Sequence, residues 1–116
     1  MSTVALVAAT PFECNRVIES IRQKRTSSSA GLTFVSGILD TGHASPRVVL
    51  CVSGIGKANA ARAATLLIAR TRPSLLVNFG VGGAYEDSRL SIGDMVIADR
   101  EHYGDEGVRI GHQLIS

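Results

Sequence analysis

The sequence predicts an α/β fold, in which short apolar strands and helices alternate along one chain. Its 116 residues are 45% hydrophobic, with three Phe, two Tyr and no Trp, so Val, Leu, Ile and Ala must build the core. Residues 48–52 are a β-branched run that leads into two glycines and an alanine-rich segment, which is typical of strand, turn and helix. A chain of this length can bury one core, and no linker divides it, so one domain is expected.

The chain begins with a predicted strand over residues 3–9, and a helix is expected directly after it. Thr10 can cap this helix, Pro11 suits its first position, and Glu13 can complete a capping box by reaching back to Thr10. The helix is expected to continue to about Arg25, because basic residues favour the carboxyl-terminal end of a helix. Residues 26–31 are polar and predict a mobile loop.

The middle of the chain predicts a hairpin and then a long helix. Residues 32–40 and 47–52 are expected to be neighbouring strands, because a glycine and a proline between them suit a short turn. A helix is expected from Lys57 to about Arg72, because small and apolar residues recur there at helical spacing and Pro73 stops it.

The last third of the chain predicts two more strands. Residues 75–79 are nearly all apolar, as expected for a central strand that is covered on both faces. Residues 95–98 predict another strand, whereas residues 103–116 contain three glycines and show only weak periodicity.

Two glycine-rich turns follow predicted strands, at residues 54–56 and 80–84. Backbone N–H groups at such turns can hold a polar ligand, and two of them suggest one pocket. A P-loop is excluded because Ala58 stands where that motif needs Ser or Thr. A dinucleotide fingerprint is excluded because Asn59 and Tyr85 replace its third glycine. Each glycine pair alone is also typical of an ordinary tight turn.

Composition and charge exclude several other functions. A net charge of +2 with scattered basic residues does not suggest a nucleic-acid partner. No apolar run is long enough to span a membrane and no signal peptide is evident, so a cytoplasmic protein is expected. Cys14 and Cys51 are expected to be reduced core thiols, and the three histidines lack metal-ligand spacing, so no metal is expected.

Glu13 is the carboxylate best placed for chemistry. It follows the first predicted strand, so it is expected at the same sheet edge as the glycine turns. Local sequence alone favours a purely structural role for Glu13 in the capping box over a chemical one. No second carboxylate is clearly placed to pair with it, and no Ser-His-Asp or Cys-His arrangement follows from spacing.

Four segments of the chain resemble the purine nucleoside phosphorylase and nucleosidase superfamily. They are residues 8–13, 53–61, 78–85 and 92–98, in the order that the superfamily has them. Within it, the sequence Ala-Thr-Pro-Phe-Glu at residues 9–13 and the stretch 103–108 are most similar to the futalosine hydrolases. The resemblance implies a three-layer α/β/α fold with a central mixed β-sheet flanked by helices.

This resemblance also implies a reaction and a set of site residues. The reaction is cleavage of an N-glycosidic bond by water, without cofactor or metal, and Glu13 matches the glutamate that orients and deprotonates that water. Ala9, Ile55 and the backbone of Val81, Gly82 and Gly83 match positions that line the base and ribose. Val81 stands where adenosine-type nucleosidases commonly carry serine, and the arginine and glycine that bind phosphate in the phosphorylases are missing, which favours water as acceptor.

Members of this family are considerably longer than 116 residues. Their second half supplies a Met-Glu pair for the ribose hydroxyls and an aspartate that protonates the leaving base. Residues 1–116 are therefore expected to be the N-terminal part of a single, truncated domain, and a homo-oligomer is expected if it folds.

The expected function is hydrolysis of futalosine to hypoxanthine and dehypoxanthine futalosine, in menaquinone biosynthesis. One alternative is a methylthioadenosine/adenosylhomocysteine nucleosidase. The other is a catalytically inactive fragment that binds a nucleoside or a partner chain.

Overall fold

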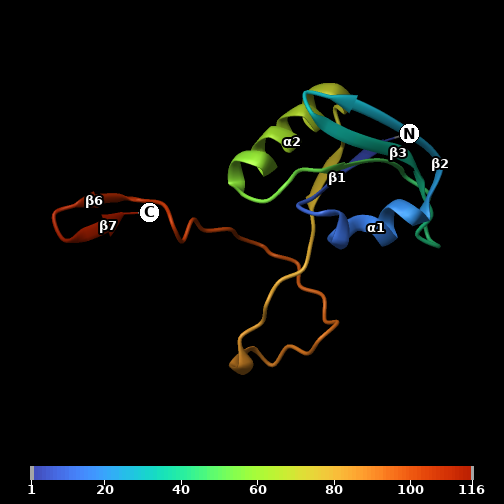
Figure 1. Ribbon diagram of the computed structural model, residues 1–116. Helices are drawn as coiled ribbons and strands as arrows, with labels where there is room; N and C mark the ends of the chain where they lie inside the picture. The colour runs from blue at the N-terminus through green and yellow to red at the C-terminus, as the bar shows by residue number, and fades with distance from the viewer. Residues whose placement is uncertain (1, 116) are drawn as a thin grey trace. The chain divides into compact units, whose positions relative to one another are not determined.

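The computed structural model describes residues 2–115, which divide into two units, one ending at Gly82 and one beginning at Gly83 (Figure 1). The first unit holds a five-stranded sheet in the order β2-β3-β4-β1-β5. β1 is parallel to β4 and β5, whereas β3 is antiparallel to β2 and β4, so the sheet is mixed. The elements of this unit are β1 (Thr3–Ala8), α1 (Pro11–Ser20), β2 (Ile21–Ser29), β3 (Leu32–Leu39), β4 (Arg47–Val52), α2 (Lys57–Thr71) and β5 (Leu75–Asn78).

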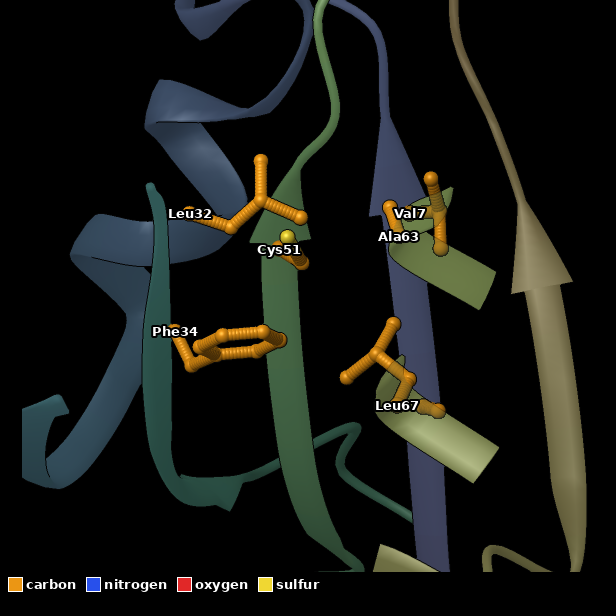
Figure 2. Close-up of a cluster of buried hydrophobic side chains, with 7 residues drawn as sticks. Val7, Leu32, Phe34, Cys51, Ala63 and Leu67 are labelled. Atoms are coloured by element: carbon orange, nitrogen blue, oxygen red, sulfur yellow. The ribbon is translucent and has the colours of Figure 1, made fainter. Parts of the chain in front are cut away.

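The two helices cover opposite faces of the sheet. Successive strand residues point to opposite faces, and in β1 Val7 packs with Leu67 of α2, whereas Leu6 packs with Cys14 of α1. Figure 2 shows the cluster on the α2 face, where Phe34 lies on the same side of the sheet as Leu67. The predicted α/β architecture with a central mixed sheet is therefore confirmed as three layers.

Local sequence signals located both helices correctly at their starts. The first begins at Pro11 behind the capping box of Thr10 and Glu13. The second runs to Thr71, and Arg72 follows in the left-handed region with a φ of 43° before Pro73. The hairpin of β3 and β4 is also confirmed, with the N–H of Thr41 donating to the carbonyl of Ala44 at 2.9 Å in its turn.

The prediction that the first helix reaches Arg25 and that residues 26–31 form a mobile loop is wrong. The helix ends at Ser20, and β2 begins at once with Ile21, which is buried and pairs with Leu39. Most of β2 is polar and exposed because it is the outer strand of the sheet, and its backbone pairs with β3 on one side. Pairing with a distant strand therefore outweighs the local polarity that suggested a loop.

The position of residues 75–79 in the sheet also differs from the prediction. β5 is a strand, but it lies at the edge of the sheet beside β1, with Leu75 and Asn78 exposed. An apolar sequence predicts that a strand can be buried, but it does not predict which elements pack against that strand. Within residues 2–115, β5 has only β1 as a neighbouring strand.

The second unit contains one short helix, η1 (Glu86–Ser88), and an antiparallel pair of strands, β6 (Val108–Ile110) and β7 (Gln113–Ile115). The strand predicted at residues 95–98 is not formed, because no strand among the described residues pairs with it. The hairpin at residues 108–115 was missed, although Gly111 stands in its two-residue turn with a φ of 62°.

No helix in the described part of the chain is long and apolar enough to cross a membrane.

Candidate functional site

The carboxyl ends of β1, β4 and β5 meet at one edge of the sheet. The three strands are parallel, and Ala8 pairs with Val52 while Val7 pairs with Asn78. Backbone hydrogen bonds continue beyond the strand ends, since the N–H of Ser53 donates to the carbonyl of Ala8 at 2.8 Å. The segments that follow these strands, which contain Glu13, residues 54–56 and residues 80–82, are therefore neighbours.

Glu13 is held at this edge by both of its carboxylate oxygens. Oε2 accepts hydrogen bonds from the backbone N–H and from the hydroxyl of Thr10, both at 3.0 Å. Oε1 accepts a hydrogen bond from the backbone N–H of Val81, in the turn after β5, at 3.2 Å. Glu13 therefore caps α1 and at the same time links the segments that follow β1 and β5. The residue is also partly exposed.

These contacts favour the ionised form of the Glu13 side chain. The backbone N–H of Val81, followed by the hydroxyl of Thr10, stabilises the carboxylate and lowers the pKa of Glu13 from its ordinary value of 4.5. Glu13 is therefore ionised at neutral pH, which leaves it able to accept a proton.

The turn after β4 is fixed by its glycines and by two polar side chains. Gly54 and Gly56 have φ values of 86° and 99°, which other residues rarely adopt. The hydroxyl of buried Ser53 donates to the carbonyl of Gly54 at 2.8 Å, and the side-chain amide of Asn59 donates to the carbonyl of Ile55 at 2.8 Å. This ordered turn leaves the Ile55 side chain 77% exposed.

Of the other predicted binding residues, Ala9, Val81 and Gly82 lie in or beside the two glycine turns of the first unit. The carbonyl of Ala9 accepts a hydrogen bond from the N–H of Gly54 at 3.0 Å, so Ala9 adjoins the turn that carries Ile55. Val81 has a side chain that is 72% exposed and a backbone that contacts Glu13. Gly82 is exposed and ends the first unit, and Gly83 is the exposed first residue of the second unit.

Sequence reasoning missed three contributors to this edge. Thr10 was expected only to cap α1, but its hydroxyl also contacts the Glu13 carboxylate. Phe12 was noticed only as part of a motif, yet its aromatic side chain is almost fully exposed in the first turn of α1. Gly80 leaves the space that the Glu13 carboxylate fills, and only its place before Val81 in the glycine turn pointed to it.

Other parts of the first unit do not share these features. A shallow hollow between α2 and the sheet is lined by Ser27, Phe34, Ser36, Val49, Arg70 and Thr71, and by none of the predicted site residues. The guanidinium group of Arg70 stacks over the Phe34 ring, with its Cζ atom 4.8 Å from the ring centre. Arg70 is therefore explained as a packing residue. Within residues 2–115, no three His, Cys, Asp or Glu side chains are grouped as metal ligands would be.

Both cysteines are free and buried, as predicted from the sequence. Burial raises the pKa of the Cys14 thiol, and the neighbouring charge of Glu13 raises it further. Burial also raises the pKa of Cys51, so both side chains act as neutral core residues.

Comparison with known proteins places this arrangement in a family. The chain matches the Phosphorylase superfamily over residues 3–113. It is 34% identical, over 105 residues, to a 5'-methylthioadenosine/S-adenosylhomocysteine nucleosidase of Bacillus cereus (strain B4264), which is 90% of this chain and 43% of that relative. The chain therefore spans less than half the length of the curated relatives it matches.

Solved structures of such nucleosidases share its fold. The enzyme of Colwellia psychrerythraea 34H, in complex with adenine, is 33% identical with a TM-score of 0.72, over 80% of this chain and 36% of that one. The enzyme of Neisseria meningitidis, in complex with methylthio-immucillin-A, is 29% identical with a TM-score of 0.61, over 67% of this chain and 32% of that one. With its mixed sheet between two helix layers and its match over most of its length, this chain belongs to the phosphorylase superfamily.

Proposed function

We propose that this chain carries the water-activating part of a nucleosidase site that acts on 5'-methylthioadenosine or S-adenosylhomocysteine. The observation that supports it most strongly is the placement of Glu13, whose carboxylate is anchored at the shared edge of three parallel strands and is still reached by solvent. The ligands and names of the relatives supply the class of substrate.

In the proposed reaction, water attacks the anomeric carbon of the ribose while the bond to the base nitrogen breaks. Ionised Glu13 orients that water and accepts its proton as the new carbon–oxygen bond forms, so that the sugar keeps the hydroxyl. The N–H of Val81 holds Oε1 of Glu13 toward the turn after β5, which keeps the proton-accepting carboxylate in one position. The base leaves with the electron pair of the broken bond and takes its proton from solvent, since no residue of this chain is assigned to that step.

The substrate is proposed to lie on the turns around Glu13. Ile55 and Val81 offer exposed apolar side chains at the ends of β4 and β5, where a flat purine can bury them. Ala9 and Gly82 have little or no side chain, so a ribose can approach their backbone closely.

The relatives favour a methylthioadenosine-type substrate over futalosine. The proteins that match are named for 5'-methylthioadenosine and S-adenosylhomocysteine, which is the alternative that the sequence left beside futalosine hydrolysis. Futalosine, with its hypoxanthine base and its link to menaquinone biosynthesis, becomes the competing substrate in the test. Self-association and a single-domain organisation stay predictions.

The proposal is tested by incubating the chain with 5'-methylthioadenosine or futalosine and detecting the free base by chromatography. Release of adenine is expected, and Glu13→Gln should lower it by about 100 to 10,000-fold, the usual contribution of a general base. Glu19→Gln is the matched control, because Glu19 is an exposed carboxylate on the same helix.

Three results would contradict the proposal in different ways. Release of hypoxanthine alone would assign the chain to futalosine. Equal activity in Glu13→Gln and wild type would remove Glu13 from the chemistry. Binding of a nucleoside by calorimetry without any turnover, unchanged in Glu13→Gln, would favour the inactive binding fragment.

A further inference from the structure

The position of the Glu13 carboxylate depends on an empty space at residue 80. A Cβ atom placed on Gly80 would lie 2.6 Å from Oε1 and 3.1 Å from Cδ of Glu13. Cβ atoms essentially never approach another heavy atom closer than 3.0 Å, so Oε1 would have to move. Gly80 and the Glu13 carboxylate therefore share a space that a larger residue would have to take for itself.

The backbone of Gly80 gives no other reason for a glycine. Six glycines of the chain have positive φ values, and Gly80 is not among them. The nearest atoms to its absent Cβ all belong to the Glu13 side chain. Gly82, two residues later in the same turn, has open space around it and no positive φ, so it provides a natural comparison.

The crowded oxygen is the one that joins the two strand ends. Oε1 accepts the hydrogen bond from the N–H of Val81, whereas Oε2 is held separately by Thr10. A Cβ at residue 80 would push Oε1 away from Val81, whereas Oε2 lies 3.6 Å from the same position, which is an ordinary contact distance. The side chain would then still cap α1 but no longer reach the turn after β5.

We propose that Gly80 is a positioning residue, whose missing side chain lets the Glu13 carboxylate reach the turn after β5 and bind the Val81 amide. The inference deepens the proposed function and rests on it for the catalytic meaning of that position. Its physical content, the coupling of residue 80 to the Glu13 carboxylate, needs no substrate to be measured.

The test compares Gly80→Ala with Gly82→Ala in the full chain, by carbon-detected nuclear magnetic resonance of the Glu13 carboxyl group across an acid titration. Gly80→Ala should raise the pKa of Glu13 toward 4.5 and shift the Val81 amide signal upfield, because the hydrogen bond between them is lost. Gly82→Ala should leave both signals unchanged. Equal pKa values in wild type and Gly80→Ala would overturn the proposal.

A second measurement keeps the test decisive if Gly80→Ala folds poorly. The double variant Glu13→Ala/Gly80→Ala removes the side chain that the new Cβ would meet. Any loss in urea midpoint caused by Gly80→Ala in wild type should therefore disappear in the Glu13→Ala background. An equal loss in both backgrounds would show that residue 80 conflicts with some other group, and the proposal would fail.

These readouts separate the inference from the proposed function. A raised pKa and a relieved double variant, in a chain that releases no base from any nucleoside, would support the positioning role and contradict the nucleosidase. Base release that depends on Glu13 but is unaffected by Gly80→Ala would support the nucleosidase and contradict the positioning role of Gly80.

Discussion

The two edges of the sheet are built on opposite principles. β2 is mostly polar and exposed, but its first residue, Ile21, is only 2% exposed and belongs to the core under α1. β5 is mostly apolar, yet Leu75 is 55% exposed and the glycine turn after it carries exposed Val81. Hydropathy alone would not have shown that the one buried residue of these two strands, Ile21, lies in the polar one.

The difference shows what each edge can do. Charged and hydroxyl side chains on β2 blunt an edge that would otherwise pair with other strands. The β5 edge has no such protection and leads directly into the turn that contacts Glu13. One edge therefore completes the fold, and the other supports the candidate site.

The largest expected effect comes from truncating one apolar residue at each edge. Ile21→Ala should lower the free energy of unfolding by about 2 to 5 kcal/mol, because it leaves a cavity in the α1 face of the core. Leu75→Ala should cost less than about 1 kcal/mol, because its side chain is largely exposed. Urea unfolding followed by circular dichroism checks both, and equal losses would contradict the comparison of the edges.

A somewhat smaller effect is expected at Gly37, which faces the irregular start of β2. A Cβ there would collide with the backbone carbonyl of Arg22 and the side chain of Ile21, where the pairing of β2 shifts register. Gly37→Ala should therefore cost about 1 to 3 kcal/mol in the same unfolding measurement. Gly82→Ala, with open space around its Cβ, is the control and should stay within about 0.5 kcal/mol of wild type.

Acid should reveal the charge of Glu13 at the other edge. Because its folded pKa is lowered, its contribution to stability is present above the ordinary value of 4.5 and is lost as pH falls through the folded pKa. Wild type should therefore lose more stability than Glu13→Gln below pH 4.5. Thermal unfolding at a series of pH values checks this, and parallel curves for the two proteins would argue against an ionised, hydrogen-bonded Glu13.

The smallest expected effect is at the ion pair of the β2 edge. Arg22 lies 3.2 Å from Asp40, but both side chains are more than half exposed, at 62% and 53%. Arg22→Gln should change the free energy of unfolding by less than about 1 kcal/mol. The same measurement is repeated in 0.5 M salt, where the Debye length is about 4 to 5 Å and exposed ion pairs are screened. If Arg22→Gln still lowers the free energy of unfolding by more than about 1 kcal/mol there, the Arg22 stem supports β2 by packing.

Sequence alone predicted the parts of the fold that depend on neighbouring residues. Thr10, Pro11 and Glu13 fixed the start of α1, and Pro73 marked the end of α2, because capping and helix termination are local. The contact between Glu13 and the glycine turn after β5 was also predictable from the sequence, because β1, β4 and β5 are parallel and their carboxyl ends share one edge of the sheet.

The remaining features depend on contacts between distant residues. β2 became a strand because Ile21 pairs with Leu39, and residues 95–98 stayed outside any strand because none of the described residues pairs with them. The space at Gly80 was invisible in the sequence, since it is defined by a side chain 67 positions earlier in the numbering, at Glu13. Local patterns cannot report such relations.

Hydrogen bonds beyond the strand ends connect the turns around Glu13 to β1, so these turns are expected to open together with the sheet. The amides of Ser53, Gly54 and Phe79 donate to carbonyls at and just after the end of β1, at 2.8 to 3.0 Å. Such amides exchange with deuterium only when the elements that hold them separate. The three should therefore exchange as slowly as the amides within β1, so that the turns around Glu13 open only when the parallel half of the sheet opens.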